Sequence, residues 1–120
     1  MEKRPVDFLI VDDSHDAADS LAILLGAMGH ETDVAYSGME ALAKVHLIQP
    51  ICVLLDISMP EMDGLDLARQ IRQEYGDNVV LIAVTGFSTD HPRVEKALEI
   101  VDYYFSKPVT LADLQRVLTK

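Results

Sequence analysis

The chain has 120 residues, the size of one ordinary domain, and its hydrophobic content of 49% is enough to bury a core. A charged fraction of 25%, with only 6 Gly and 5 Pro, excludes a disordered or fibrous chain. Acidic residues outnumber basic ones 20 to 10, and the formal charge of −10 disfavours direct binding to nucleic acid or to an anionic membrane. We expect a single domain over residues 1–120, without a separate output domain.

The N-terminal segment does not have the composition of a signal peptide or a membrane anchor. Residues 1–5 contain consecutive charged residues, and the short apolar stretch after them ends at Asp12. The single cysteine, Cys52, lies in an apolar run and predicts a buried structural thiol that needs no oxidising compartment. We therefore expect a cytoplasmic protein.

Strand and helix patterns alternate from the start of the chain. The apolar run at residues 6–11 predicts a strand. From Asp16 the apolar residues recur at helical spacing until Gly29, which is a typical helix stop. Residues 32–35 predict a second, weaker strand.

The central part of the chain repeats this alternation with clearer boundaries. Ser37, with Glu40 three residues later, forms a capping box that predicts the start of a helix, and Pro50 ends that helix. Residues 51–55 are apolar at every position, which is typical of a strand that is buried on both faces. Residues 64–75 then predict a third helix.

Two more strand–helix pairs complete the chain. Residues 79–84 predict a fourth buried strand, and residues 92–100 predict the helix that follows it. Residues 102–105 predict a fifth strand. Thr110, with Asp113 three residues later, predicts the cap of a last helix.

Alternating strands and helices with buried apolar strands predict an α/β fold: a (βα)5 doubly wound, five-stranded parallel sheet with helices on both faces. The apolar side of each helix is expected to face the sheet. We expect Leu98 in the fourth helix and Leu111 in the fifth to be among these inward-facing residues.

Polar residues follow four of the five predicted strands. Asp12 and Asp13 follow the first strand, Asp56 the third, Thr85 the fourth and Lys107 the fifth. In open α/β sheets, functional groups gather at the carboxyl ends of the strands. The second strand contributes no such group, as expected of an edge strand remote from the site. This distribution predicts the strand order 2-1-3-4-5.

Three carboxylates that converge on one site repel each other by roughly 4 kcal/mol per pair at about 4 Å and an effective dielectric constant near 20. A divalent cation would neutralise them, and an all-oxygen site with few protein ligands favours Mg²⁺. Asp56, at the end of the central strand, is then placed to attack phosphorus and form an aspartyl phosphate. Taken singly, each residue has an ordinary role as a helix-start, turn or surface residue; the conjunction of all of them favours the site.

The chain resembles the receiver domains of response regulators, the phosphoacceptors of two-component signalling, over essentially its whole length. These domains have the flavodoxin-like form of the predicted fold. The residues that carry the resemblance are Asp12-Asp13, the motif Leu54-Leu55-Asp56-Ile57-Ser58-Met59-Pro60-Glu61-Met62-Asp63-Gly64, Thr85-Gly86 and Lys107-Pro108.

The resemblance implies a role for each residue of the motif. It implies that Asp56 is the phosphorylated residue and that Asp12, Asp13, Asp56 and the backbone carbonyl of Ser58 bind Mg²⁺. It implies that the Thr85 hydroxyl bonds the phosphoryl group when the switch is on.

Further roles follow from the same resemblance. Lys107 is expected to pair with the phosphoryl group and to precede Pro108 through a cis peptide bond, and Gly86 to leave room beside the phosphate. Tyr104 is expected to be the aromatic switch residue, whereas Tyr103 faces the other side of its strand and is expected at the surface.

The implied function is a phosphorylation-dependent switch. The phosphodonor is a phosphohistidine of a histidine kinase or a histidine phosphotransfer protein. The domain catalyses its own aspartyl phosphorylation and dephosphorylation and is not an enzyme acting on a separate substrate. Phosphorylation changes the face formed by the fourth helix, fifth strand and fifth helix, which alters partner binding. The output partner, and whether the chain forms a homodimer, stay open.

One departure from the family pattern lies at this face. The turn glycine usual between the fourth helix and the fifth strand is missing, since residues 98–102 read Leu-Glu-Ile-Val-Asp. The fourth helix is therefore expected to end differently from its counterparts.

Three other classes of protein share part of this pattern. A Mg²⁺-dependent aspartate-nucleophile phosphatase of the haloacid dehalogenase type needs a second aspartate two residues after the first, where this chain has Ser58. A flavin carrier would place a phosphate where Asp12 and Asp13 repel it. A phosphate-independent adaptor is the third alternative, and the complete set of site residues argues against it.

Overall fold

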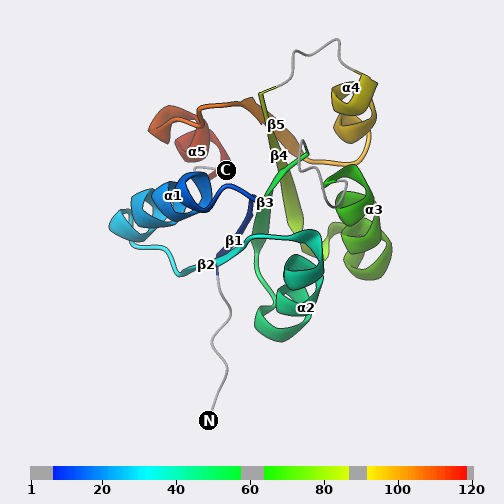
Figure 1. The fold of residues 1–120 in the computed structure, drawn as a ribbon, viewed down its shortest axis with the longest axis horizontal. Helices are drawn as coiled ribbons and strands as arrows, with labels where there is room; N and C mark the ends of the chain where they lie inside the picture. The colour runs from blue at the N-terminus through cyan, green and yellow to red at the C-terminus, as the bar shows by residue number, and fades with distance from the viewer. Residues whose placement is uncertain (1–6, 58–63, 87–91, 119–120) are drawn as a thin grey trace.

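The computed structural model describes residues 7–57, 64–86 and 92–118, which form five parallel strands that alternate with five helices (Figure 1). The strands are β1 (Phe8–Val11), β2 (Thr32–Ala35), β3 (Cys52–Asp56), β4 (Val80–Thr85) and β5 (Tyr103–Ser106). The helices are α1 (His15–Ala27), α2 (Gly38–Ile48), α3 (Gly64–Tyr75), α4 (Pro92–Leu98) and α5 (Leu111–Leu118), with one 3₁₀ turn at Gly76–Asn78. The predicted α/β class is confirmed.

The sheet has the strand order β2-β1-β3-β4-β5, and every pairing is parallel, as predicted. Val11 pairs with Leu55, and Asp56 pairs with Val84. This register brings the last residues of β1, β3 and β4 to one edge of the sheet, which we call the carboxyl edge.

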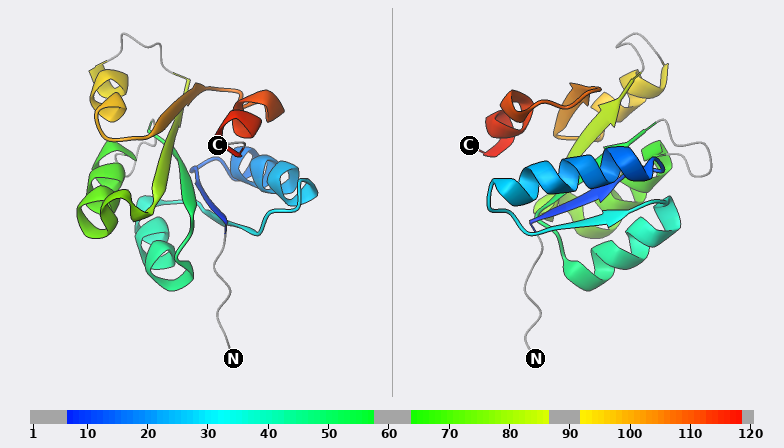
Figure 2. Two further views of the ribbon diagram at one scale, coloured as in Figure 1. Left: turned by 180° about the vertical axis from the view of Figure 1, so that it is seen from behind. Right: turned by 60° about the vertical axis from the view of Figure 1, so that its left-hand side comes forward.

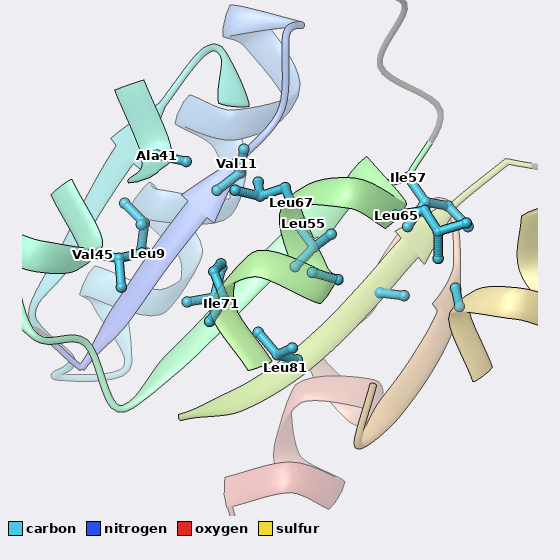
Figure 3. Close-up of a cluster of buried hydrophobic side chains, with 14 of the residues drawn as sticks. Leu9, Val11, Ala41, Val45, Leu55, Ile57, Leu65, Leu67, Ile71 and Leu81 are labelled. Atoms are coloured by element: carbon cyan, nitrogen blue, oxygen red, sulfur yellow. The ribbon is translucent and has the colours of Figure 1, made fainter. Parts of the chain in front are cut away.

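Helices cover both faces of the sheet, with α2, α3 and α4 on one face and α1 and α5 on the other (Figure 2). Alternation along each strand supplies both cores. In β1, Leu9 and Val11 point to the α2–α3–α4 side, whereas Phe8 and Ile10 point to the other. Figure 3 shows the first of these cores, where leucine and isoleucine side chains of α3 lie over β1, β3 and β4. The strands are thus held rigidly from both sides.

Side-chain caps begin three of the helices. The Ser14 hydroxyl accepts from the Ala17 amide, so α1 starts at His15, one residue before the predicted start at Asp16. The predicted capping box at Ser37 is confirmed: its hydroxyl accepts from the Glu40 amide at 3.1 Å. The predicted cap of α5 is also confirmed. The Thr110 hydroxyl accepts from the Asp113 amide, and the Asp113 carboxylate accepts from the Thr110 amide.

The expected burial of Leu98, Leu111 and Ile51 is wrong, and so is the expected end of the fourth helix. Leu98 is 48% exposed and Leu111 is 42% exposed. Helix α4 ends at Leu98 and not at residue 100, because the amides of Ile100 and Val101 both turn back to the Ala97 carbonyl. Ile51, which was expected inside the third strand, lies before β3 and is 53% exposed. Periodicity predicts which side of a helix is apolar but not how far the sheet extends beneath it.

Within residues 7–57, 64–86 and 92–118, no helix combines the length and the apolar composition that crossing a membrane requires.

Candidate functional site

Asp12, the first residue of the acidic pair that follows β1, is held by the backbone around it. The Asp12 amide donates to the Ala35 carbonyl of β2, and the Asp12 carboxylate accepts from the Ser14 amide at 3.0 Å. The Asp12 side chain is buried, with 4% of the residue exposed, whereas Asp13 is exposed. The pair therefore presents one held carboxylate and one that faces solvent.

Asp56 is the last residue of the central strand β3 and is 4% exposed. Its position depends on Gly64, the first residue of α3. A methyl group at Gly64 would lie 2.7 Å from the Cα atom of Ile57 and would overlap the carbonyl group of Asp56. Only glycine allows α3 to begin this close to the end of β3. Sequence analysis placed Gly64 in the motif but gave it no role, because the close approach is visible only in three dimensions.

Lys107 joins the two buried carboxylates. Its ammonium group lies 2.9 Å from an Asp56 oxygen and 3.2 Å from an Asp12 oxygen. The Lys107 amide donates to the Thr85 carbonyl at 2.9 Å, which fixes the end of β5 against the end of β4. The Lys107–Pro108 peptide bond is cis, as the resemblance predicts.

Carboxylate oxygens of Asp12, Asp13 and Asp56 all lie within 4.8 Å of one another. Three oxygens at this spacing can contact one ion, and hard oxygen ligands with room for water suit Mg²⁺. These residues therefore fit the metal that the sequence predicts. The fourth predicted ligand, the backbone carbonyl of Ser58, lies outside the described residues.

The surroundings of the site raise the pKa values of two of its groups, the Asp12 carboxyl and the Lys107 ammonium. Burial raises the pKa of the Asp12 carboxyl, and the charge of Asp56 raises it further, while hydrogen bonds from Ser14 and Lys107 act in the opposite direction. Burial lowers the pKa of Lys107, but its hydrogen bonds to Asp56 and Asp12 outweigh burial and raise the pKa overall. The ammonium form of Lys107 is thus favoured between the carboxylates.

The remaining predicted residues lie around this centre. Thr85 is fully buried at the end of β4, and a methyl group added at Gly86 would meet nothing within 4 Å. Tyr104 is half-buried against the core on the α2–α3–α4 side. Tyr103 packs against the opposite core and is also half-buried, so the expectation that it lies at the surface is only partly correct.

The fold and this arrangement define a class of protein. A family model described as the response regulator receiver domain matches residues 8–119. The response regulator MprA of Mycobacterium sp. (strain KMS) is 34% identical over 110 residues, which cover 92% of this chain and 47% of MprA. The chain therefore belongs to the response regulator receiver domain family, and it spans about half the length of the curated relatives it matches.

Solved structures give the same assignment. The crystal structure of a CheY-like receiver domain protein from Methanospirillum hungatei JF-1 has a TM-score of 0.86 at 29% identity, covering 96% of this chain and 91% of that one. The response regulator TrrA of Thermotoga maritima, solved in complex with Mg²⁺-BeF, has a TM-score of 0.83 at 31% identity, covering 95% of this chain and 96% of that one.

Proposed function

We propose that this receiver domain is a Mg²⁺-dependent switch in which Asp56 accepts a phosphoryl group. The observation that carries the proposal is the position of Asp56. Its buried carboxylate lies 2.9 Å from the Lys107 ammonium and belongs to the same oxygen cluster as Asp12 and Asp13. The T. maritima relative, whose structure is in complex with Mg²⁺-BeF, supports the same combination of metal and phosphoryl chemistry.

The transfer step follows from the groups present. A carboxylate oxygen of Asp56 attacks phosphorus, a new oxygen–phosphorus bond forms, and the bond from phosphorus to the donor nitrogen breaks. Mg²⁺, held by Asp12, Asp13, Asp56 and the Ser58 carbonyl, would supply the positive charge that screens these carboxylates from the phosphoryl oxygens. Lys107 provides a second positive charge and moves its hydrogen bond from the Asp56 carboxylate to the phosphoryl group.

The same contacts connect phosphorylation to the signalling face. The Thr85 hydroxyl donates to a phosphoryl oxygen, and Thr85 is linked through its carbonyl to the amide of Lys107. A shift at the end of β4 therefore reaches β5, where Tyr104 packs against the core on the α4 side. Tyr104 then rotates inward, and the α4–β5–α5 face changes its partner preference.

The proposed partners follow from two-component signalling. The donor is a phosphohistidine on a histidine kinase or a histidine phosphotransfer protein, and the relatives' name, response regulator, supports this. The domain acts as a phosphoacceptor that catalyses its own phosphorylation and dephosphorylation. The formal charge of −10 argues against direct binding to nucleic acid.

Intact mass spectrometry after incubation with acetyl phosphate and Mg²⁺ tests the proposal. We expect one phosphoryl adduct that hydroxylamine removes. The adduct should be absent when EDTA replaces Mg²⁺ and absent in Asp56→Asn. Asp66→Asn, an exposed aspartate on α3, serves as the matched control and should retain it. An adduct that persists in Asp56→Asn would overturn the assignment, and Mg²⁺ binding without any adduct would favour the phosphate-independent adaptor.

A further inference from the structure

A cavity lies beside the acidic site, on the side of the sheet that α1 covers. It has a volume of about 470 Å³ and lies between α1, the carboxyl ends of β1, β3 and β4, and the chain that follows β5. We call it the α1 cavity. Its aliphatic part is lined by Ala17, Leu21, Leu24, Leu54, Val84 and Val109. Both its volume and its mainly apolar walls are typical of sites that hold small organic molecules.

The cavity exists because part of α1 is not covered. Leu21 and Leu24 have helical spacing toward the core, yet both are only partly buried. Ala17, one turn earlier on the same side of α1, fills little of the space. Covering apolar surface that is in contact with water lowers the free energy, so these walls favour a hydrocarbon occupant.

The other end of the cavity is polar and carries net negative charge. Asp12, Asp56 and Lys107 form this end, and the Asp13 oxygens lie within 4.8 Å of those of Asp12 and Asp56. Among these residues three carboxylates face one ammonium, and that ammonium already donates to both Asp12 and Asp56. An anionic head group is therefore repelled, and a second copy of this chain, with its formal charge of −10, is disfavoured as well.

We propose that the α1 cavity binds small amphiphiles that carry one ammonium group on a compact hydrocarbon body. The body lies against Leu21, Leu24 and Val109, and the ammonium group points toward the Asp12 and Asp56 carboxylates. This site is separate from the phosphoacceptor function, but it shares the carboxylates at its polar end. An amphiphile bound there competes with a divalent cation for the same oxygens, so it acts as an antagonist of the metal.

Three probes with one skeleton test the charge requirement: 4-phenylbutylamine, 4-phenylbutanol and 4-phenylbutyrate. Binding is measured by calorimetry and by ¹H–¹⁵N NMR, without Mg²⁺ and without a phosphodonor. We expect the amine to bind about tenfold or more tightly than the alcohol, as one partly screened charge pair predicts, and the carboxylate to bind most weakly. Shifts should concentrate at residues 17–24 and 107–109. Adding Mg²⁺ should weaken binding of the amine and leave that of the alcohol unchanged.

Two variants of α1 test the location. Leu24→Lys places a cation in the apolar wall and should remove amine binding, whereas Ile23→Lys, at a neighbouring position that is 73% exposed, should leave it intact. If Leu24→Lys loses the dispersed spectrum of a folded protein, Ala17→Leu, which fills the cavity, takes its place. Four results would each overturn the proposal. They are equal binding of all three probes, tighter binding of the carboxylate than of the amine, no binding of any probe, and amine binding that survives the cavity variant. Because no phosphodonor is present, none of these results depends on whether Asp56 is phosphorylated.

Discussion

At the scale of single residues, the buried carboxylate of Asp12 lowers the stability of the metal-free fold. Asp12 is 4% exposed and lies close to Asp56. The Lys107 ammonium group, 3.2 Å from an Asp12 oxygen, compensates part of the negative charge of this carboxylate. Burial and the neighbouring charge raise the pKa of this carboxyl, so the metal-free folded state binds its proton more tightly than the unfolded state does. Stability consequently falls as the pH rises from the ordinary aspartate range through the raised pKa, and the full cost is present at neutral pH.

Asp12→Asn should therefore stabilise the metal-free protein at neutral pH, by an amount on the order of 1 kcal/mol. It should also flatten the dependence of stability on pH in the acidic range and abolish stabilisation by Mg²⁺. Urea unfolding in EDTA and in Mg²⁺, over a series of pH values, measures all three effects. Asp16→Asn, an exposed aspartate on α1, is the matched control and should change none of them. A less stable Asp12→Asn protein in EDTA would contradict this interpretation.

Substitution by alanine should have opposite effects on stability at Gly64 and at Gly26. Gly64→Ala forces a methyl group against the backbone of Asp56 and Ile57, so it should destabilise the protein by roughly 1–3 kcal/mol and reduce phosphoryl transfer to Asp56. Gly26→Ala, inside α1 with open space around it, should stabilise by about 0.5–1 kcal/mol. Thermal unfolding and adduct formation check both variants, and a neutral Gly64→Ala would show that the backbone at β3 adjusts freely.

At the scale of elements, Arg72 on α3 explains how α4 ends without a turn glycine. Its guanidinium group donates to the Ile100 carbonyl at 2.9 Å and 3.1 Å, and to the carbonyls of Gly76 and Val79. It also pairs with the Asp102 carboxylate at 2.9 Å, and that carboxylate in turn accepts from the Leu81 amide. No residue from 98 to 102 has a positive φ. The turn is therefore held by side-chain contacts and not by a left-handed residue.

Arg72→Met should remove this support and leave several backbone carbonyls without a partner, at a cost of roughly 2–3 kcal/mol. Hydrogen exchange at residues 96–102 should accelerate more than exchange in α1. Arg69→Met, one turn earlier on α3 with its side chain 51% exposed, should change stability by less than about 0.5 kcal/mol. Equal effects of the two variants would show that Arg72 does not hold the α4–β5 turn.

Local signals in the sequence predicted where helices begin better than they predicted which side chains the fold buries. The caps at Ser37 and Thr110 were predictable because a capping box needs only residues that are three apart. The exposure of Leu98 and Leu111 was not, since it depends on where the sheet ends beneath each helix. The contacts of Arg72 with residues 28 and 30 positions away leave no local pattern, so sequence analysis could not find them.

At the scale of the whole molecule, the parallel sheet is what made the site predictable. Parallel strands place their carboxyl ends at one edge, so Asp12, Asp13, Asp56, Thr85 and Lys107 could be assigned to one place from strand order alone. The distances between them, and the α1 cavity beside them, depend on how α1 and the chain after β5 pack against the sheet. That packing could not be predicted from periodicity.

The central claim is that occupation of the Asp56 site changes the distant α4–β5–α5 face. The most direct test is ¹H–¹⁵N NMR of the protein with Mg²⁺ and beryllium fluoride, an analogue of the phosphoryl group. We predict resonance changes at residues 12–13, 56, 85–86 and 107 that extend through residues 92–118, and none of these in Asp56→Asn. Changes confined to the site, or a face that responds equally in Asp56→Asn, would contradict the account.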